Sequence, residues 1–224
     1  MTGEEVNSRL HILEQEIAAD CLTGATTAEA YNLIVGLDGK PTGPVVDIGA
    51  GASPWVGWLV DHGVDAYAVD RLYENEEKLE ESIQASNEVV LAQTPSSYRA
   101  TLERALQSFR QSFQVNRERY VPGWFTNLPF PDDFSELTVA LNSVSDMGKD
   151  ADILLASIVE GVRITRPGGR FVMAPFHTSD GLNSRFSRQH QKVLGKLKAM
   201  NIGEIRVAKD IPQYLSARLI IEKR

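Results

Sequence analysis

A strand that leads through a glycine-rich loop into a helix is the feature that most restricts how this chain folds. Val45–Ile48 has the composition of a buried strand, and the segment 49–54 that follows it reads GAGASP. Ser53 can accept a hydrogen bond as the N-cap residue, Pro54 suits the first helical position, and Gly63 can end the helix. A strand, a tight loop and a helix in this order predict an α/β fold.

Apolar runs and helical patterns alternate along the rest of the 224 residues, which is typical of a mostly parallel sheet with helices on both faces. The length suits one such domain, and we expect residues 1–224 to form it. Seven segments have the pattern of strands: Val45–Ile48, Ala66–Val69, Tyr120–Phe125, Leu137–Leu141, Arg170–Ala174, Glu204–Ala208 and Ala217–Ile221.

Residues 1–44 are expected to form a helical cover over the domain. Apolar residues recur at helical spacing near the start of the chain, at Val6, Leu10, Leu13 and Ile17. A second helical pattern over 27–35 leads to the first strand, and a third over 191–200 precedes the last two strands.

Residues 71–119 form a helical insertion where a simple βαβ unit has one helix. The first half is acidic, the second half is rich in arginine, and Pro95 separates them, so we expect two helices. The second helix has an apolar stripe, made of Leu102, Ala105, Leu106, Phe109 and Phe113. This stripe can pack against the first helix or the domain. Alternatively, the insertion is a lid over the strand ends, where ligands of such folds bind.

The net charge and the single cysteine limit the partners of the chain. A formal net charge of −7 gives no large basic face for nucleic acid or an anionic membrane. Cys21 is the only cysteine and the four histidines have no metal-ligand spacing, so we expect no disulfide and no metal. The polar start MTGEEVNSRL is unlike a signal peptide, and no apolar run has the length of a membrane span, so we expect a cytoplasmic protein.

The glycine loop can be compared with known nucleotide-binding loops. A dinucleotide-binding loop has glycine or alanine where this chain has Pro54. A P-loop has Gly-Lys-Ser/Thr after four spacer residues, and no such lysine follows here. The chain instead has an acidic residue followed by Gly-x-Gly-x-Ser, at Asp47, Gly49, Gly51 and Ser53. This pattern resembles the first motif of the class I S-adenosylmethionine-dependent methyltransferases.

The resemblance implies that the loop and the end of the second strand hold S-adenosylmethionine. Asp47 would offer negative charge to the ammonium group of the cofactor, and Asp70, about 20 residues beyond the glycines, would accept hydrogen bonds from ribose hydroxyls. Each carboxylate also has a local interpretation, in which Asp47 caps backbone amides and Asp70 starts a turn. The other expected cofactor contacts are Gly49, Ala50, Gly51, Ser53, Arg71, Leu72, Trp124, Phe125 and Asn142.

Further segments extend the resemblance along the chain. Leu128–Asp133, LPFPDD, is similar to the stretch that these methyltransferases often carry before their fourth strand, and Arg166–Phe171, RPGGRF, is similar to their turn into the fifth. The family fold is a doubly wound, mostly parallel sheet of seven strands with one antiparallel strand. Ala68–Tyr73, the insertion and Arg117–Pro122 look like a poorly characterised bacterial subgroup of these enzymes.

Two departures from the family pattern affect the site. Where many members have Gly-Asp-Ala, with the aspartate near the adenine amino group, Gly123 is followed by Trp124 and Phe125. Their rings can stack against adenine or can be core residues at a strand end, and Leu72 is another candidate adenine wall. Residues 141–146 read LNSVSD instead of the Asn/Asp-Pro-Pro-aromatic motif of enzymes that methylate nucleic-acid amino groups, which disfavours that activity.

Candidate catalytic residues follow the fourth and fifth strands, where both sets should face the ligand crevice: Asn142, Ser143, Asp146 and His177. Methyl transfer needs little acid–base machinery, because the sulfonium is an activated donor and the protein mainly aligns the acceptor and excludes water. His177 is the candidate general base, since a pKa of about 6.5 suits proton removal at neutral pH. The alternative is a solvated loop histidine.

The sequence therefore favours methyl transfer from S-adenosylmethionine to an unidentified acceptor, which we expect to be a small molecule. A second hypothesis is a non-catalytic S-adenosylmethionine-binding or interaction protein with the same fold, which the missing Gly-Asp-Ala aspartate supports. A third is a nucleotide-dependent oxidoreductase, which Pro54 disfavours.

Overall fold

The structure, a computed structural model, describes residues 28–37, 39–93, 96–141, 143, 150–176, 184–208 and 217–224. The predicted helical pattern at Val6–Ile17 lies outside these ranges. In chain order the elements are α2 Ala28–Val35, β1 Val45–Ile48, α3 Trp55–Asp61, β2 Ala66–Val69, the 3₁₀ helix η1 Arg71–Glu74, α4 Glu76–Gln93, α5 Ser96–Val115, the 3₁₀ helix η2 Arg117–Arg119, β3 Tyr120–Val121, β4 Ser135–Leu141, α6 Ala151–Ile164, β5 Thr165–Ala174, α7 Ser184–Met200, β6 Gly203–Ala208 and β7 Arg218–Lys223.

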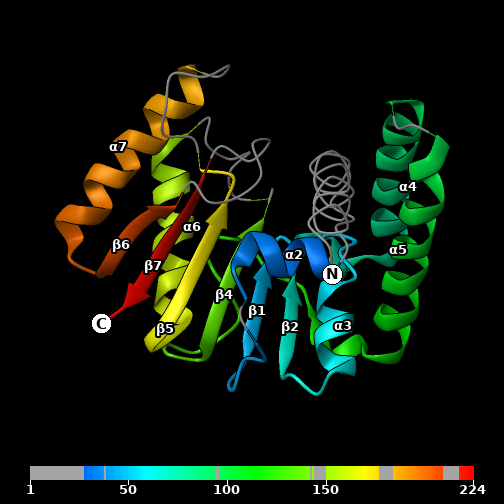
Figure 1. Ribbon diagram of the computed structural model, residues 1–224, viewed down its shortest axis with the longest axis horizontal. Helices are drawn as coiled ribbons and strands as arrows, with labels where there is room; N and C mark the ends of the chain where they lie inside the picture. The colour runs from blue at the N-terminus through cyan, green and yellow to red at the C-terminus, as the bar shows by residue number, and fades with distance from the viewer. Residues whose placement is uncertain are drawn as a thin grey trace, which may run out of the picture.

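The strands form one seven-stranded sheet in the order β3-β2-β1-β4-β5-β7-β6 (Figure 1). Strands β3, β2, β1, β4 and β5 are parallel, whereas β7 is antiparallel to both of its neighbours. The predicted doubly wound sheet with one antiparallel strand is confirmed. The strand order reverses between β1 and β4, and ligands of open α/β sheets bind beyond the carboxyl ends of the strands at such a point.

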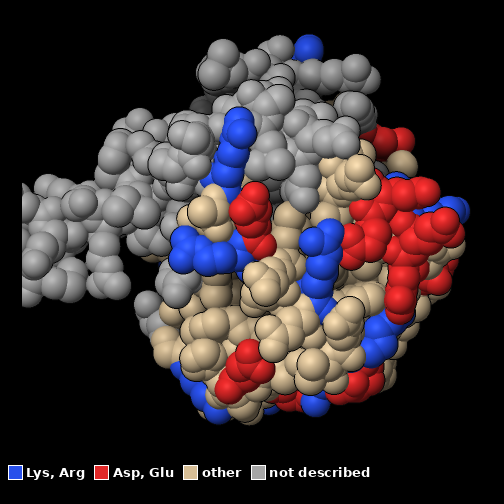
Figure 2. Space-filling view, turned by 90° about the vertical axis from the view of Figure 1, so that its right-hand side faces the viewer, with Lys and Arg blue, Asp and Glu red and all other residues tan. Residues whose placement is uncertain are grey.

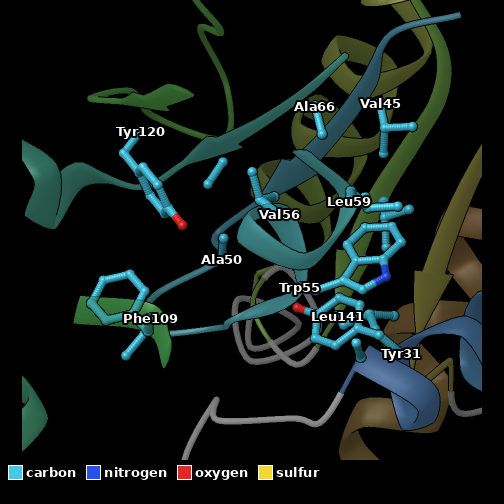
Figure 3. Packing of buried hydrophobic residues seen from close by; sticks show 14 of the residues in the cluster. Tyr31, Val45, Ala50, Trp55, Val56, Leu59, Ala66, Phe109, Tyr120 and Leu141 are labelled. Atoms are coloured by element: carbon cyan, nitrogen blue, oxygen red, sulfur yellow. The ribbon is translucent and has the colours of Figure 1, made fainter. Parts of the chain in front are cut away.

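Helices cover both faces of the sheet, and each face has its own apolar cluster. Val45 belongs to the cluster beneath α2, α3 and α5, while Val46 belongs to the cluster beneath α6 and α7. Figure 3 shows the first cluster, in which Trp55 of α3 lies against Tyr31 of α2, with ring centroids 4.7 Å apart. Successive side chains of β1 point to opposite faces of the sheet. Because helices cover both faces, β1 is buried along its whole length.

The helix after the glycine loop ends as predicted at Gly63, whereas its N-cap is Pro54 and not the predicted Ser53. It begins at Trp55, one residue later than expected, but Pro54 already has helical torsion angles (φ −78°, ψ −4°). The Ser53 hydroxyl accepts the Trp55 N–H at 3.2 Å. At the other end Gly63 has φ +71°, and Val64 donates to the Leu59 carbonyl at 2.9 Å.

Five of the seven predicted strands have different bounds in the structure, and the third and the fifth differ most. The third strand was expected over Tyr120–Phe125 but ends at Val121, because Pro122 has no N–H to continue the ladder. The chain then turns, so that Trp124 forms only an isolated bridge with Asn127. The fifth strand is longer than expected and begins at Thr165, with residues 166–169 bulging opposite the single residue Glu136 of β4.

The insertion consists of two helices, as predicted, and stands beside the β3 edge of the sheet (Figure 1). The residues of the predicted stripe are all buried: Leu102, Ala105, Leu106, Phe109 and Phe113. Helix α5 approaches α3 so closely that a Cβ added at Gly57 would overlap the Ser112 hydroxyl. The packing interpretation of the stripe is confirmed, while a lid function of residues 71–119 stays a prediction.

The outer face of the insertion carries side chains of both charges. Figure 2 shows acidic side chains gathered on this side of the molecule with basic ones beside them. One pair joins the two helices, since the Arg110 guanidinium contacts the Glu80 carboxylate at 2.6 Å. Both partners are about half exposed, so this ion pair contributes little to stability.

Candidate functional site

The glycine loop lies at the carboxyl ends of β1 and β2. The Gly49 N–H donates to the Val69 carbonyl at 2.6 Å, which ties the loop to the neighbouring strand. Gly49 has φ +67°, and a Cβ there would overlap the Ser143 side chain and lie 2.7 Å from Cε1 of Phe125. Only glycine fits this position, because both the backbone conformation and the available space exclude a side chain.

Gly51 occupies a different environment in the same loop. Its φ is +52°, but a Cβ would meet nothing within 4 Å, so open space lies beside its backbone. Its N–H donates to Oδ2 of Asp70 at 3.1 Å, and its carbonyl oxygen accepts the Tyr73 hydroxyl at 2.7 Å. The peptide groups on both sides of Gly51 are therefore held by residues that follow β2.

Asp70 combines the predicted local role with capacity for a ligand. Its Oδ1 accepts the Leu72 N–H at 2.9 Å and thus caps η1, while Oδ2 accepts the Gly51 N–H. Each carboxylate oxygen can accept two hydrogen bonds, so both retain acceptor capacity. Burial raises the pKa of Asp70, and the two backbone hydrogen bonds and the Arg71 charge partly offset this rise.

Asp47 is the most unusual group at this edge of the sheet. Its side chain is fully buried, and neither carboxylate oxygen has a hydrogen bond of ordinary geometry with a described residue. Burial raises its pKa to about 8; the nearby Tyr31 hydroxyl lowers it and the Asp70 charge raises it. A buried acid in this state is suited to a cationic or hydrogen-bond-donating group of a ligand, which would satisfy it.

Aromatic side chains follow β3 at the edge of the sheet that holds the carboxyl ends of the parallel strands. Trp124 is 52% exposed, and the Arg71 guanidinium lies 5.6 Å from its ring centroid. Phe125 is half-buried and lies against the glycine loop at Gly49, while Leu72 is partly buried against the α3 side of the core. Trp124 is therefore not a core residue, and its exposed ring differs in its surroundings from the half-buried ring of Phe125.

The LPFPDD segment that carries the chain from these rings to β4 is fixed to α6. Glu160 accepts the Leu128 N–H at 2.7 Å, and Arg163 donates to the Leu128 carbonyl at 3.2 Å. Arg163 also contacts Asp132 at 2.6 Å and Glu160 at 2.7 Å. Both contacts raise the pKa of Arg163 above its ordinary value, so it stays charged.

One of the four candidate catalytic residues lies within the described ranges. The Ser143 hydroxyl donates to the Ile48 carbonyl at 2.8 Å, which places this residue beside the glycine loop. Asn142, Asp146 and His177 lie outside the described residues. No group of three or more His, Cys, Asp or Glu residues within those ranges is arranged to hold a metal ion.

Two tyrosines near the loop were not among the predicted site residues. Tyr31 faces the site from α2, and Tyr73 reaches Gly51 from η1. Neither has a sequence signal, since Tyr31 belongs to an ordinary apolar helix and Tyr73 follows Asp70 in what reads as the start of the insertion. Their roles depend on the approach of separate segments.

Hollows among the described residues also occur at the opposite edge of the sheet, around Lys40 and Pro41. One of them has a volume of about 340 Å³ and is bordered by Trp58 and His62. This edge holds the amino ends of the parallel strands, whereas ligands of open α/β sheets bind at the carboxyl ends. We therefore assign the site to the glycine loop. No helix in the described ranges is long and apolar enough to cross a membrane.

Comparison with known proteins gives matches to solved structures alone. The sequence matches no protein-family model and no curated protein. The fold matches PigF, solved with SAH, at a TM-score of 0.53 and 14% identity over 99% of this chain and 69% of PigF. It also matches a candidate O-methyltransferase from Nostoc punctiforme PCC 73102 (TM-score 0.54, 14% identity, 88% of this chain and 56% of the other) and TnmH (0.50, 16%, 87% and 54%).

The chain has the fold of the class I S-adenosylmethionine-dependent methyltransferases. At 14–16% identity the likeness shows the fold alone, and a proposal about activity has to be argued from the site.

Proposed function

We propose that this protein binds S-adenosylmethionine at the glycine loop and transfers its methyl group to a small-molecule acceptor. The observation that carries the proposal is the buried carboxyl of Asp47, which lacks an ordinary hydrogen bond among the described residues and lies at the end of β1 beside a glycine loop. Asp70, at the end of the adjacent strand, provides a second acidic group. Two acids of this kind match the ammonium and ribose hydroxyls of one ligand.

In this proposal each residue contacts a different part of the cofactor. Asp47 provides a negative charge for the ammonium group, and the remaining acceptor capacity of Asp70 is available to the ribose hydroxyls. Gly51 leaves space for close approach of the ligand to the backbone. The cofactor, when bound, supplies a methyl group that is already activated on a sulfonium.

The adenine-contacting residues in this proposal are Leu72, Phe125 and Trp124, with Arg71 beside the Trp124 ring. An aromatic face contributes about 1 kcal/mol beyond the area that it buries. Because no Gly-Asp-Ala aspartate is present, stacking replaces the hydrogen bond to the adenine amino group.

For the transfer step we propose that the segment after β4 and the residue His177 after β5 align the acceptor. The first set contains Asn142, which also contacts the cofactor, together with Ser143 and Asp146. His177 removes the proton of a hydroxyl acceptor in this proposal, which an amine or thiolate acceptor does not require. The net charge of −7 favours a small acceptor over nucleic acid. A cytoplasmic location stays a prediction.

Titration calorimetry with S-adenosylmethionine, S-adenosylhomocysteine and NAD tests the binding step. We expect both adenosyl compounds to bind and NAD to produce no heat of binding. If the wild-type protein binds neither adenosyl compound, the proposal is wrong, and binding of NAD alone supports an oxidoreductase.

Transfer of a radiolabelled methyl group from S-adenosylmethionine to a panel of phenols, carboxylic acids, amines and a total RNA sample tests the reaction. We expect label in a small molecule. Tight binding without labelled product across this panel favours a non-catalytic S-adenosylmethionine-binding protein, and label in RNA contradicts the small-molecule acceptor.

A further inference from the structure

We propose that Tyr73 is a positioning residue that sets the conformation of the cofactor loop at Gly51 and connects this loop to the end of helix α5. The inference rests on the proposed function, because it gives the loop its role as the cofactor site. Tyr73 is not itself an expected cofactor contact, and it reaches the loop through its hydrogen bond to the Gly51 carbonyl.

Gly51 is held by one hydrogen bond on each side of its α-carbon. Its N–H donates to Asp70 at 3.1 Å, and its carbonyl accepts from the Tyr73 hydroxyl at 2.7 Å. A glycine with φ +52° and no atom near its missing Cβ has no steric reason to keep one conformation. The two hydrogen bonds therefore select the orientation of its peptide groups.

The Tyr73 bond also determines where the next amide points. In a trans peptide the carbonyl of Gly51 and the N–H of Ala52 point in opposite directions. Because Tyr73 fixes the carbonyl, the Ala52 N–H is directed away from Tyr73, and it has no hydrogen-bond acceptor among the described residues. Without the tyrosine hydroxyl, the peptide group between Gly51 and Ala52 would be free to rotate.

Tyr73 itself is held tightly by the end of the insertion. Its side chain is 1% exposed and its ring lies 5.7 Å from the Phe113 ring and 5.5 Å from the Tyr120 ring. The Arg117 guanidinium donates to the carbonyls of Tyr73 at 2.8 Å and Tyr120 at 2.7 Å, and it lies over the Phe113 ring at 4.7 Å. A continuous set of contacts thus leads from the carboxyl end of α5 to Gly51.

The hydroxyl group distinguishes positioning from packing. A phenylalanine would fill the same space between Phe113 and Tyr120, so the aromatic cluster does not require the oxygen. Burial holds the pKa of the Tyr73 hydroxyl well above its ordinary value, so the hydroxyl stays protonated and donates to Gly51.

The test compares Tyr73→Phe with Tyr120→Phe. Tyr120 is a matched control, because its ring belongs to the same buried cluster and its hydroxyl makes a hydrogen bond of similar length, 2.8 Å, to Ser112 instead of the loop. Amide hydrogen exchange in the protein without ligand, measured by NMR, reports on the loop. Calorimetry with S-adenosylhomocysteine reports on binding.

We expect the Gly51 amide, which is hydrogen-bonded to Asp70, to exchange about tenfold faster in Tyr73→Phe and at the wild-type rate in Tyr120→Phe. We expect S-adenosylhomocysteine to bind about three- to tenfold more weakly to Tyr73→Phe only. Wild-type exchange and binding in Tyr73→Phe overturn the inference, and so do equal effects in both variants. If the wild-type protein does not bind S-adenosylhomocysteine, the proposed function fails, while the exchange rates still decide whether Tyr73 orders Gly51.

Discussion

Asp47 has a pKa that is raised mainly by burial and further by the charge of Asp70, the acid at the end of the neighbouring strand. The two residues differ in their surroundings, because Asp70 accepts two backbone hydrogen bonds and Asp47 has no ordinary one among the described residues. Like charges at neighbouring strand ends disfavour each other. An ammonium group placed at Asp47 would offset this repulsion, and Asp70 keeps acceptor capacity for the ribose hydroxyls of the same ligand.

The stability of the protein without ligand is expected to fall as the pH rises. The folded protein keeps a proton on Asp47 up to a pKa of about 8, whereas the unfolded chain releases it near 3.8. The stabilising contribution is therefore complete below pH 3.8 and lost as the pH rises through about 8. Its slope is at most about 1.4 kcal/mol per pH unit.

Urea unfolding at several pH values between about 5 and 8 measures this effect, with Asp47→Asn as the variant that cannot titrate. We expect a shallower pH dependence in the variant. Parallel curves for the two proteins would contradict the buried, protonated state of Asp47.

Cofactor affinity is expected to change with pH in the opposite direction. The ammonium of S-adenosylmethionine is stabilised by the ionised form of Asp47, so affinity should rise as the pH increases toward about 8 and then level off. Calorimetry in buffers of different ionisation enthalpy should also detect proton release on binding near pH 7. An affinity that is independent of pH between about 6 and 8 would argue against contact with Asp47.

Gly51→Ala is expected to impair binding more than folding. The substitution places a side chain in the open space beside the loop and costs about 1–2 kcal/mol of backbone strain at φ +52°. Gly168→Ala is the matched control, since Gly168 also has positive φ (+75°) and an open Cβ position but lies in the β5 bulge. We expect similar losses of unfolding free energy and at least about tenfold weaker S-adenosylhomocysteine binding in Gly51→Ala only. Equal affinities in the two variants would mean that the ligand lies elsewhere.

Arg163→Gln is expected to destabilise the fold. The substitution leaves Glu160, whose side chain is 14% exposed, without its charged partner and releases the Leu128 carbonyl. We expect a loss of about 1–3 kcal/mol in the free energy of unfolding. Arg110→Gln, which breaks the half-exposed pair with Glu80, should cost less than about 0.5 kcal/mol. Denaturant titration of both variants measures the difference, and equal losses would refute a special role for the α6 contacts.

Trp124 offers an optical test of the adenine position. If adenine stacks on this half-exposed ring, S-adenosylhomocysteine should change tryptophan fluorescence in the wild-type protein, and Trp124→Phe should abolish the change. Trp58→Phe serves as the control, because Trp58 of α3 stacks on His62, the C-cap residue of that helix, with ring centroids 4.1 Å apart. A change that persists in Trp124→Phe but disappears in Trp58→Phe would contradict adenine stacking at Trp124.

Local sequence patterns predicted most of the fold. The strand Val45–Ile48, the helix end at Gly63 and the pair of helices after β2 depend on neighbouring residues, and the structure confirms them. The third strand was predicted too long, because the turn after Val121 depends on contacts with Asp70 and the loop before β4 as well as on Pro122. Residue type alone does not determine where such a segment leaves the sheet.

The sequence by itself determined the order of strands and helices along the chain, the glycine loop and the acids at the ends of β1 and β2, because spacing and side-chain chemistry along the chain are sufficient for these. Only the tertiary structure decided that Asp47 is buried without an ordinary hydrogen bond among the described residues, and that Tyr73 holds Gly51. Both relationships join segments that come together only when the sheet forms and the insertion packs against it. Burial and hydrogen-bond geometry depend on how these segments approach one another, and the periodicity of a single segment does not predict that approach.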